Sequence, residues 1–370
     1  MTDSTIISNQ LASILTKYSL GELASPIEQL TNGWTNLTLK FQTKPNGKTY
    51  ILRQYLPSTL RPINLEYIQF ELNFIAYLFN ELHLSVAPAI DPPGIFPLNN
   101  ESYCAIFPFI EGIKYLDTPA TPTRQLWQTL EISRFLGRMH SNIQTNQYKL
   151  TSITRRTINF VKIKYELVHS CEEFQKEYPD LYQRIRIITD NSMKSIPLIS
   201  DKIEQDHFQE NLEKDLPIGY IHADLHDDNV LFSSTEKKIA AVLDFDDMYI
   251  GPLLIDIAMT LCLWCGIGSK FNIDYAKEFL TVYQNERGML LTENEWNLLE
   301  IYCYLTVLNQ ILFTIEVEEC AKPIEDMINE LLLPIEHIGK EEKMFKRKKT
   351  KREKKSFRSR IVFKNMQTVR

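Results

Sequence analysis

Short apolar segments enclose a strongly polar loop in the sequence Y-I-H-A-D-L-H-D-D-N-V-L-F, residues 220–232. Tyr220-Ile221 and Val230-Leu231-Phe232 read as short buried strands on either side of that loop. A third apolar run, 239–243, ends at the acidic cluster D-F-D-D, 244–247. We therefore expect the polar loop and the acidic cluster to meet, because each leaves the end of a short buried strand.

Three polar side chains in these segments suit a metal-assisted reaction. Mg²⁺ prefers hard oxygen ligands and is usually held by one or two carboxylates plus phosphate oxygens, so Asn229 and Asp244 are suitable ligands. Asp224 can then face an acceptor hydroxyl. In-line phosphoryl transfer needs positioning and charge neutralisation more than covalent help, and these groups supply both. The spacing thus indicates transfer from a Mg-nucleotide to a hydroxyl.

The spacing H-x-D-x-x-x-x-N, with D-F about fifteen residues later, resembles the catalytic and metal motifs of kinase-like folds. Ala223 stands where protein kinases usually have Arg, and D-F-D-D runs at once into G-P-L-L-I-D-I-A, 251–258, without a long activation segment. The sequence more closely resembles the aminoglycoside phosphotransferase and choline kinase family. The segment L-P-I-G-Y-I-H-A-D-L-H-D-D-N-V-L-F, residues 216–232, resembles the homoserine kinase-like branch of that family.

This resemblance implies an α+β fold with two lobes, as in protein kinases: a small antiparallel β lobe and a larger, mainly helical lobe. We expect residues 1–110 to form the nucleotide-clamping lobe and 111–338 the catalytic and acceptor-binding lobe. Residues 339–370 are expected to form a separate basic tail.

The resemblance also implies roles for the polar loop. Asp224 would accept or orient the proton of the acceptor hydroxyl, and Asn229 and Asp244 would hold Mg²⁺ across the nucleotide phosphates. His222 would brace the loop, although a satisfied core histidine explains it equally well. Asp256 would support the loop from the next helix; a lone carboxylate within P-L-L-I-D-I-A-M-T-L is costly to bury, so it should accept hydrogen bonds from backbone or from His222.

The remaining acids of these loops are open to two interpretations. Asp246 and Asp247 could touch a metal or substrate, but we favour solvated turn carboxylates. The same interpretation applies more strongly to His226, Asp227 and Asp228.

The N-terminal third should supply the nucleotide clamp. Residues 27–30, 37–43 and 49–55 read as three strands joined by glycine-containing turns. By resemblance, Gly33 and Asn36 in the first turn would fold over the phosphates. An ordinary hairpin turn explains T-N-G-W nearly as well.

The third of these strands departs from the protein-kinase pattern. Protein kinases place Lys at the position of Arg53, paired with a Glu on the next helix. Arg occurs here in parts of the small-molecule kinase group, and its guanidinium can bridge phosphate oxygens to a carboxylate. We predict Glu71 as the partner, within a helix over 64–79, and interpret Glu66 as a first-turn surface carboxylate.

The segment Y-C-A-I-F-P-F-I-E-G, 103–112, is an apolar strand that leads into a Pro- and Gly-containing stretch. By resemblance it is the hinge between lobes, where the backbone of Phe109 or Glu111 would meet adenine; a buried edge strand is the alternative. Helical spacing over 124–140 follows, and His140 at its end is interpreted as a helix-end or core histidine.

Composition favours a protein of the cytoplasm, where ATP is available. No run of about 20 uncharged apolar residues occurs, and the N-terminus M-T-D-S-T-I-I-S lacks the features of a secretory signal. Cys262-x-x-Cys265 has redox spacing, but it lies in the apolar stretch T-L-C-L-W-C, so buried packing is favoured.

Charge is unevenly distributed. Residues 340–370 carry fourteen Lys or Arg against three Glu, a net of +11, which leaves −17 for 1–339 out of the −6 of the whole chain. We expect this tail to be disordered; it could contact nucleic acid, an acidic membrane surface or the protein's own acidic body, and no single role is favoured. The acidic body argues against nucleic acid as the substrate.

Three functions compete. The first is a small-molecule kinase that uses ATP and Mg²⁺, with homoserine or a related amino alcohol as acceptor and an aminoglycoside-type acceptor as an alternative; GTP stays open as donor. The second is a kinase acting on protein Ser/Thr, which the missing A-P-E opposes. The third is a non-catalytic nucleotide-binding protein, which the joint presence of Asp224, Asn229 and Asp244 opposes.

Overall fold

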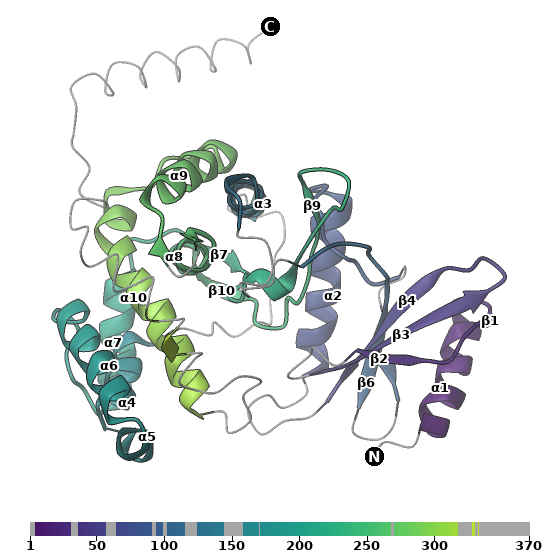
Figure 1. Cartoon of the computed structure of the whole chain (residues 1–370), viewed down its shortest axis with the longest axis horizontal. Helices are drawn as coiled ribbons and strands as arrows, with labels where there is room; N and C mark the ends of the chain where they lie inside the picture. The colour runs from purple at the N-terminus through teal and green to yellow at the C-terminus, as the bar shows by residue number, and fades with distance from the viewer. Residues whose placement is uncertain are drawn as a thin grey trace, which may run out of the picture.

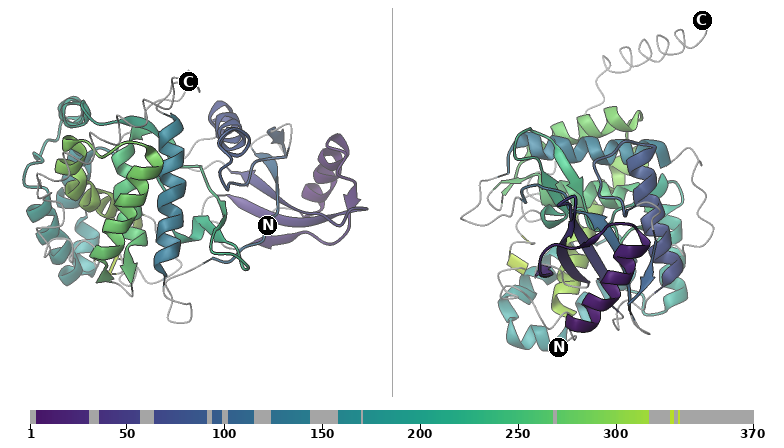
Figure 2. Two further views of the ribbon diagram at one scale, coloured as in Figure 1. Left: turned by 90° about the horizontal axis from the view of Figure 1, so that it is seen from above. Right: turned by 90° about the vertical axis from the view of Figure 1, so that its right-hand side faces the viewer.

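The computed structural model describes residues 4–30, 36–56, 64–90, 94–98, 102–114, 124–143, 158–169, 171–267, 270–316, 328–329 and 332. A small lobe built on a β-sheet lies beside a larger lobe made mainly of helices (Figure 1 and the left view of Figure 2). The predicted α+β, two-lobed fold is therefore confirmed. The lobe boundaries remain predictions, and the basic tail 339–370 lies outside the described residues.

The sheet of the small lobe is antiparallel, with the order β1-β3-β4-β6-β5 and β2 paired to β3. Its strands are β1 (Glu22–Leu23), β2 (Glu28–Leu30), β3 (Leu37–Lys44), β4 (Thr49–Tyr55), β5 (Phe96–Pro97) and β6 (Tyr103–Pro108). Because side chains alternate along a strand, Leu52 and Ile106 join one apolar cluster, whereas Tyr55 and Phe107 join another on the opposite face. This alternation places Arg53 on the same face as Tyr55.

Helix α1 (Ser4–Lys17) covers the first of these faces and was not anticipated from the sequence. Its buried residues Leu11, Ile14 and Leu15 recur at helical spacing and pack with Leu39, Phe41 and Leu52 of the sheet. Figure 1 shows α1 and α2 on opposite sides of the sheet. The small lobe thus has three layers.

Helix α2 (Leu65–Asn80) covers the other face and matches the helix predicted over 64–79. It begins at the N-cap Asn64, whose side chain accepts a hydrogen bond from the Tyr67 backbone at 3.0 Å. Ile68 packs with the sheet, whereas Phe70 and Phe74 belong to the core of the large lobe. One side of α2 therefore packs against the sheet of the small lobe, and the other side packs against the large lobe.

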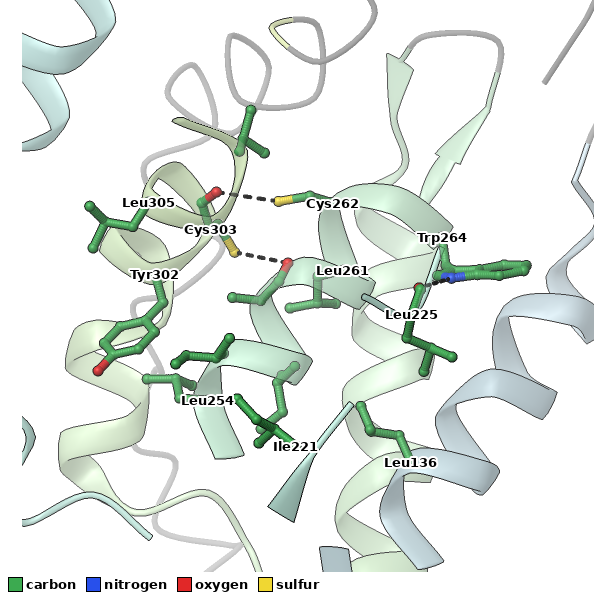
Figure 3. Close-up of a cluster of buried hydrophobic side chains, with 14 of the residues drawn as sticks. Leu136, Ile221, Leu225, Leu254, Leu261, Cys262, Trp264, Tyr302, Cys303 and Leu305 are labelled. Atoms are coloured by element: carbon green, nitrogen blue, oxygen red, sulfur yellow. Dashed lines mark hydrogen bonds between the residues drawn. The ribbon is translucent and has the colours of Figure 1, made fainter. Parts of the chain in front are cut away.

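The large lobe is built around the buried helix α8 (Leu253–Trp264). Its other helices are α3 (Leu126–Ile143), α4 (Phe160–His169), α5 (Glu172–Glu177), α6 (Pro179–Ser192), α7 (Lys202–Glu213), α9 (Ile273–Arg287) and α10 (Glu293–Glu316). In Figure 3, Cys262 of α8 faces Cys303 of α10, and its thiol lies 3.6 Å from the Cys303 carbonyl oxygen. Cys262 and Cys265 are buried free thiols, so the packing interpretation is confirmed.

Two short antiparallel strand pairs lie against this helical core. β7 (Ile218–Ile221) pairs with β10 (Tyr249–Pro252), and β8 (Val230–Phe232) pairs with β9 (Ile239–Val242). The loop 222–229 joins β7 to β8, and the loop 243–248 joins β9 to β10. Because the two strand pairs share these connections, both loops emerge at the same place. A further hairpin, β11 (Gly266–Ile267) and β12 (Lys270–Phe271), follows α8.

Helix α10 is long and apolar enough, by length and composition, to cross a membrane, and it is the one helix of this kind among the residues that the structure describes. Of the most apolar part of this helix, 61% is buried inside the protein. Its Tyr302, Cys303 and Leu305 pack in the large-lobe core, as expected of a core helix.

Gly137 marks the closest approach of α3 and α9. A Cβ atom at this position would lie 2.7 Å from Glu286 Cβ and 2.8 Å from the carbonyl oxygen of Tyr283. We predict that Gly137→Ala destabilises the protein by about 1–3 kcal/mol, because overpacking outweighs the better helix propensity of alanine. Urea denaturation of both proteins measures the difference.

The control is Thr281→Ala on the exposed side of α9, which should be neutral or slightly stabilising. A Gly137→Ala protein as stable as the parent would contradict the close contact between the two helices.

Candidate active site

The loop after β7 holds Asp224 beside Asn229. The Asn229 side-chain amide donates from Nδ2 to the Asp224 backbone oxygen at 2.9 Å and to Asp224 Oδ2 at 3.0 Å. Asn229 is only 7% exposed, so its orientation is fixed by these bonds. Since Nδ2 is committed to Asp224, the amide oxygen Oδ1 is the atom left for another partner.

His222 joins this loop to the loop that carries Asp244. Its ring lies 3.0 Å from the Leu243 carbonyl oxygen through Nε2 and 3.3 Å from the Asp224 backbone nitrogen through Nδ1. These contacts assign the proton to Nε2, which donates to Leu243, while Nδ1 accepts from Asp224. Leu243 in turn donates its N–H to the Asn229 backbone at 2.8 Å. His222 is fully buried and acts as a satisfied core histidine that braces both loops.

Asp256, in the first turn of α8, fixes the backbone of the Asp224 loop. Its Oδ2 accepts from the His222 N–H and its Oδ1 from the Ala223 N–H, both at 2.8 Å. The expectation that this fully buried carboxylate accepts backbone hydrogen bonds is confirmed. Ala223 has φ +64°, a left-handed conformation that costs about 1–2 kcal/mol, so the two bonds hold a strained residue in place.

His140 completes the environment of Asp256. Its Nε2 lies 3.3 Å from Asp256 Oδ2, and its Nδ1 lies 2.9 Å from the Tyr283 hydroxyl. Burial lowers the pKa of His140, although Asp256 opposes that effect. The predicted role of a core histidine at the end of the 124–140 helix fits this position within α3.

Arg53 contacts two loop carboxylates in addition to the predicted partner Glu71. Its Nη2 lies 2.8 Å from Asp244 Oδ1 and 2.5 Å from Asp246 Oδ2, whereas Nη1 is 4.0 Å from Glu71 Oε1. The expected pairing with Glu71 is therefore the loosest of the three contacts. Glu66 is exposed, as predicted. Helix α2 places Glu71 near Arg53, but the carboxylates of the acidic loop lie closer to the guanidinium.

The charges of this group depend on burial and on Arg53. Burial would raise the pKa of Asp244, but Arg53 counters it and the pKa falls to about 2. Burial raises the pKa of Glu71 well above its ordinary value, and Asp246 adds to that effect. Asp244 also has φ +61°, so its carboxylate is displayed from a strained backbone.

The interpretation of Asp246 as a solvated turn carboxylate is wrong. Its side chain is 12% exposed, and Oδ2 accepts hydrogen bonds from Arg53 and from the Asn36 amide, both at 2.5 Å. Asp247 is half-buried. The pattern D-F-D, with buried Phe245 between two acids, is the sequence feature that could have identified Asp246. Asn36 contacts this acidic loop, and Gly33 lies outside the described residues.

The interpretation of His226 and Asp227 as solvated turn residues also fails. Asp227 is 18% exposed and its Oδ2 lies 2.7 Å from Arg124 Nη2. His226 stands between Asp224 Oδ2, 3.3 Å from Nε2, and Asp227 Oδ1, 3.7 Å from Nδ1. The neighbouring Asp228 is about half-exposed, and it pairs loosely with Lys114 at 3.7 Å.

These carboxylates determine the charge of His226. Burial lowers the pKa of His226, but hydrogen bonds to Asp224 and Asp227 overcome it and raise the pKa to about 10. Nδ1 also lies 3.3 Å from the Asp228 backbone nitrogen, a contact that only the neutral ring can accept. Protonation at Nδ1 would exchange this contact for a donation to Asp227, and both ring N–H groups would then face carboxylates.

The hinge segment continues the sheet of the small lobe beyond β6. The Phe109 N–H donates to the Thr49 carbonyl oxygen at 3.1 Å and so extends the sheet rather than facing a ligand. Glu111 is exposed, and Ile113 exchanges two backbone hydrogen bonds with Phe232 of β8. An adenine contact from Phe109 would therefore use its carbonyl group.

The side chains at this site have the chemistry needed to bind Mg²⁺ and the phosphates of a nucleotide, as the sequence implied. Asn229 Oδ1 and the Asp244 carboxylate are hard oxygen ligands on adjoining loops, which suits Mg²⁺. Arg53 beside Asp244 supplies a cation for phosphate oxygens. Together with the two lobes, these residues define a kinase-like protein.

Comparison with solved structures agrees. The fold matches a spectinomycin phosphotransferase in complex with ADP and its antibiotic, with TM-score 0.61, 12% identity, and coverage of 91% of this chain and 98% of the other. It also matches the choline kinase of Cryptosporidium parvum Iowa II, with TM-score 0.58, 16% identity, and coverage of 92% and 96%. At these identities the likeness establishes the fold.

The family is established by sequence. Residues 26–290 match the model of the phosphotransferase enzyme family, and the chain belongs to that family. Homoserine kinase of Caulobacter vibrioides is 40% identical over 106 residues, which are 27% of this chain and 32% of that protein. Homoserine kinase of Methylocella silvestris is 41% identical over 86 residues, 23% and 26% of the respective chains. The matched stretch thus spans about a third or less of these curated relatives.

Asp256→Asn tests the buried anchor of the loop. The amide keeps the shape of the carboxylate, but it replaces one acceptor oxygen by an NH₂ group, and the backbone N–H that this oxygen served is left without an acceptor. We predict a loss of about 2–3 kcal/mol in the free energy of unfolding, measured by urea denaturation. Asp274→Asn, the same change in the exposed first turn of α9, should cost less than about 1 kcal/mol. Equal losses would contradict the anchor.

His226→Gln tests the charge of the imidazolium. The folded-state pKa of about 10 lies above the ordinary 6.5, so its stabilising contribution is complete below pH 6.5 and is lost as pH rises toward 10. We predict that the parent loses more unfolding free energy between pH 6 and 9.5 than His226→Gln does. The control His207→Gln, at an exposed site on α7, should follow the parent. Parallel curves for all three proteins would contradict the assignment.

Proposed function

We propose that the protein is a small-molecule kinase that transfers the γ-phosphoryl group of Mg-ATP to the hydroxyl of an amino alcohol, with homoserine as the first candidate. The observation that carries the proposal is the position of Asp224. Its carboxylate is held by Asn229 Nδ2 at 3.0 Å, on the loop beside the one that presents Asp244. A candidate proton acceptor and two candidate metal ligands therefore lie on adjoining loops. A cytoplasmic location, where ATP is available, fits this activity.

Each residue then has a defined task. Asn229 Oδ1 and Asp244 would hold Mg²⁺, which supplies charge neutralisation at the phosphates when bound. Asp224 would orient the acceptor and take its hydroxyl proton as the hydroxyl oxygen attacks the γ-phosphorus and ADP departs. Asp256 and His222 touch no reacting atom; they would keep Asp224 and Asp244 in register through the contacts that fix both loops. Arg53 would meet the phosphates from the small lobe.

The acceptor class rests on the relatives. The protein is similar over part of its length to homoserine kinases, and its fold is similar to a microcompartment-associated aminopropanol kinase with TM-score 0.57 and 15% identity. Both names describe a small molecule with an amino group and a hydroxyl. An aminoglycoside or a protein Ser/Thr hydroxyl is the alternative acceptor.

Coupled ADP release by the full chain with Mg-ATP tests the proposal. Homoserine, ethanolamine, choline, 1-amino-2-propanol, spectinomycin and a Ser/Thr peptide mixture serve as acceptors. Turnover that depends on one of the four amino alcohols supports the proposal. Turnover only with spectinomycin or peptide, or none above the blank, overturns the acceptor class.

The Asp224→Ala protein is the blank for this assay. Without its proton acceptor, turnover should fall about 10²–10⁴-fold while the dissociation constant for Mg-ADP changes little. Asp244→Ala should instead weaken Mg-ADP binding, because a metal ligand is lost. Wild-type turnover in Asp224→Ala would remove this residue from the chemistry.

A further inference from the structure

The loop 243–248 of the large lobe is held by side chains of the small lobe. Asn36 and Arg53 both donate to Asp246 Oδ2 at 2.5 Å. The Tyr67 hydroxyl of α2 lies 2.7 Å from the Asp246 carbonyl oxygen and 2.5 Å from that of Met248. Asp246 is thus contacted through both its side chain and its backbone by three different elements of the small lobe.

Arg53 is shared between two acids of this loop, Asp244 and Asp246, and only Asp244 is a candidate metal ligand. Asp244 is a candidate metal ligand, and its Oδ1 is 2.8 Å from Arg53 Nη2. A cation that binds Asp244 competes with Arg53 for that carboxylate, because both are positive. Asp246 has no such competitor in the proposed reaction. Its side chain is also the less exposed of the two, 12% against 40%.

We propose that Asp246 is a positioning residue that retains Arg53 when Asp244 exchanges the guanidinium for Mg²⁺. This inference rests on the proposed function, since it concerns the same nucleotide site. Asp246, rather than the predicted Glu71, would then be the carboxylate that keeps the Arg53 guanidinium in place.

The geometry favours Asp246 over Glu71. Arg53 approaches Asp246 at hydrogen-bond distance, whereas its nearest Glu71 oxygen is 4.0 Å away. Glu71 Oε1 is buried without a hydrogen-bond partner among the described residues, so it does not anchor the guanidinium by a direct bond. Hydrogen bonds between ionised groups are about twice as strong as neutral ones, and the Arg53–Asp246 contact joins a guanidinium to a carboxylate.

The consequence concerns the dependence of nucleotide binding on Mg²⁺. Without Asp246, Arg53 would keep only Asp244 at hydrogen-bond distance and the looser contact with Glu71, and it would compete more strongly with the metal for Asp244. We expect Asp246→Asn to raise the Mg²⁺ concentration for half-maximal ADP binding about tenfold, which corresponds to about 1.4 kcal/mol. The neighbouring change Asp247→Asn, which removes the same charge one residue along, should shift it less than about twofold. Calorimetric ADP titrations at a series of Mg²⁺ concentrations give both values.

The Arg53→Met background separates positioning from direct metal binding. If Asp246 acts through Arg53, Asp246→Asn has no further effect on the Mg²⁺ dependence once Arg53 is absent. An effect of the same size in that background means that Asp246 binds the metal or acts by charge alone, and it overturns the proposal. An equal shift in Asp247→Asn does the same.

Stability of the nucleotide-free protein supplies a second test that needs no ligand. Double-mutant cycles by urea denaturation compare the coupling of Arg53→Met with Asp246→Asn and with Glu71→Gln. The proposal requires the Asp246 coupling to be the larger, and the reverse order overturns it. A protein that binds no ADP would refute the proposed function, whereas this comparison would still decide which acid holds Arg53.

Discussion

The carboxylate of Asp256 is the interaction on which the rest of the site depends. It is fully buried, yet it accepts two backbone N–H bonds at 2.8 Å from a loop that would otherwise not hold its shape. Through the strained Ala223 these bonds set the direction of Asp224, and through His222 they reach Leu243 and the acidic loop. A buried carboxylate is tolerable only when its oxygens have hydrogen-bond partners, and His222, Ala223 and His140 supply them.

The sequence predicted the parts of the site that are local. Asp224, Asn229 and Asp244 sit at the ends of short apolar strands, so the polar loop and the acidic cluster could be expected to meet. The ion pairs of Arg53 with Asp244 and Asp246 could not be predicted, because Asp244 is 191 residues away and no spacing rule links the two segments. Helix α1 was missed for another reason: its apolar stripe of Leu11, Ile14 and Leu15 is short within a polar segment. The contact of Asp227 with Arg124 likewise depends on a residue that is distant in sequence and lies just before α3.

The two lobes meet through aromatic as well as charged contacts. Phe74 of α2 packs against Tyr220 of β7, with ring centroids 5.1 Å apart, and against Phe245 of the acidic loop at 6.3 Å. Phe245 in turn lies 4.5 Å from the ring of His222. A continuous column of rings therefore runs from the small lobe to the histidine that braces the two loops. The polar contacts of Asp246 and the apolar contacts of Phe245 hold the same segment from opposite sides.

The double attachment of α2 has a consequence for how this protein folds. Phe70 and Phe74 of that helix lie in the core of the large lobe, while Ile68 and Leu72 complete the core under the sheet. Separation of the lobes would expose Phe70 and Phe74, at a cost of about 1.5–3 kcal/mol for each fully buried residue. The core of the large lobe is therefore incomplete without α2. We therefore expect the two lobes to unfold together as one cooperative unit, although they look like two separate domains.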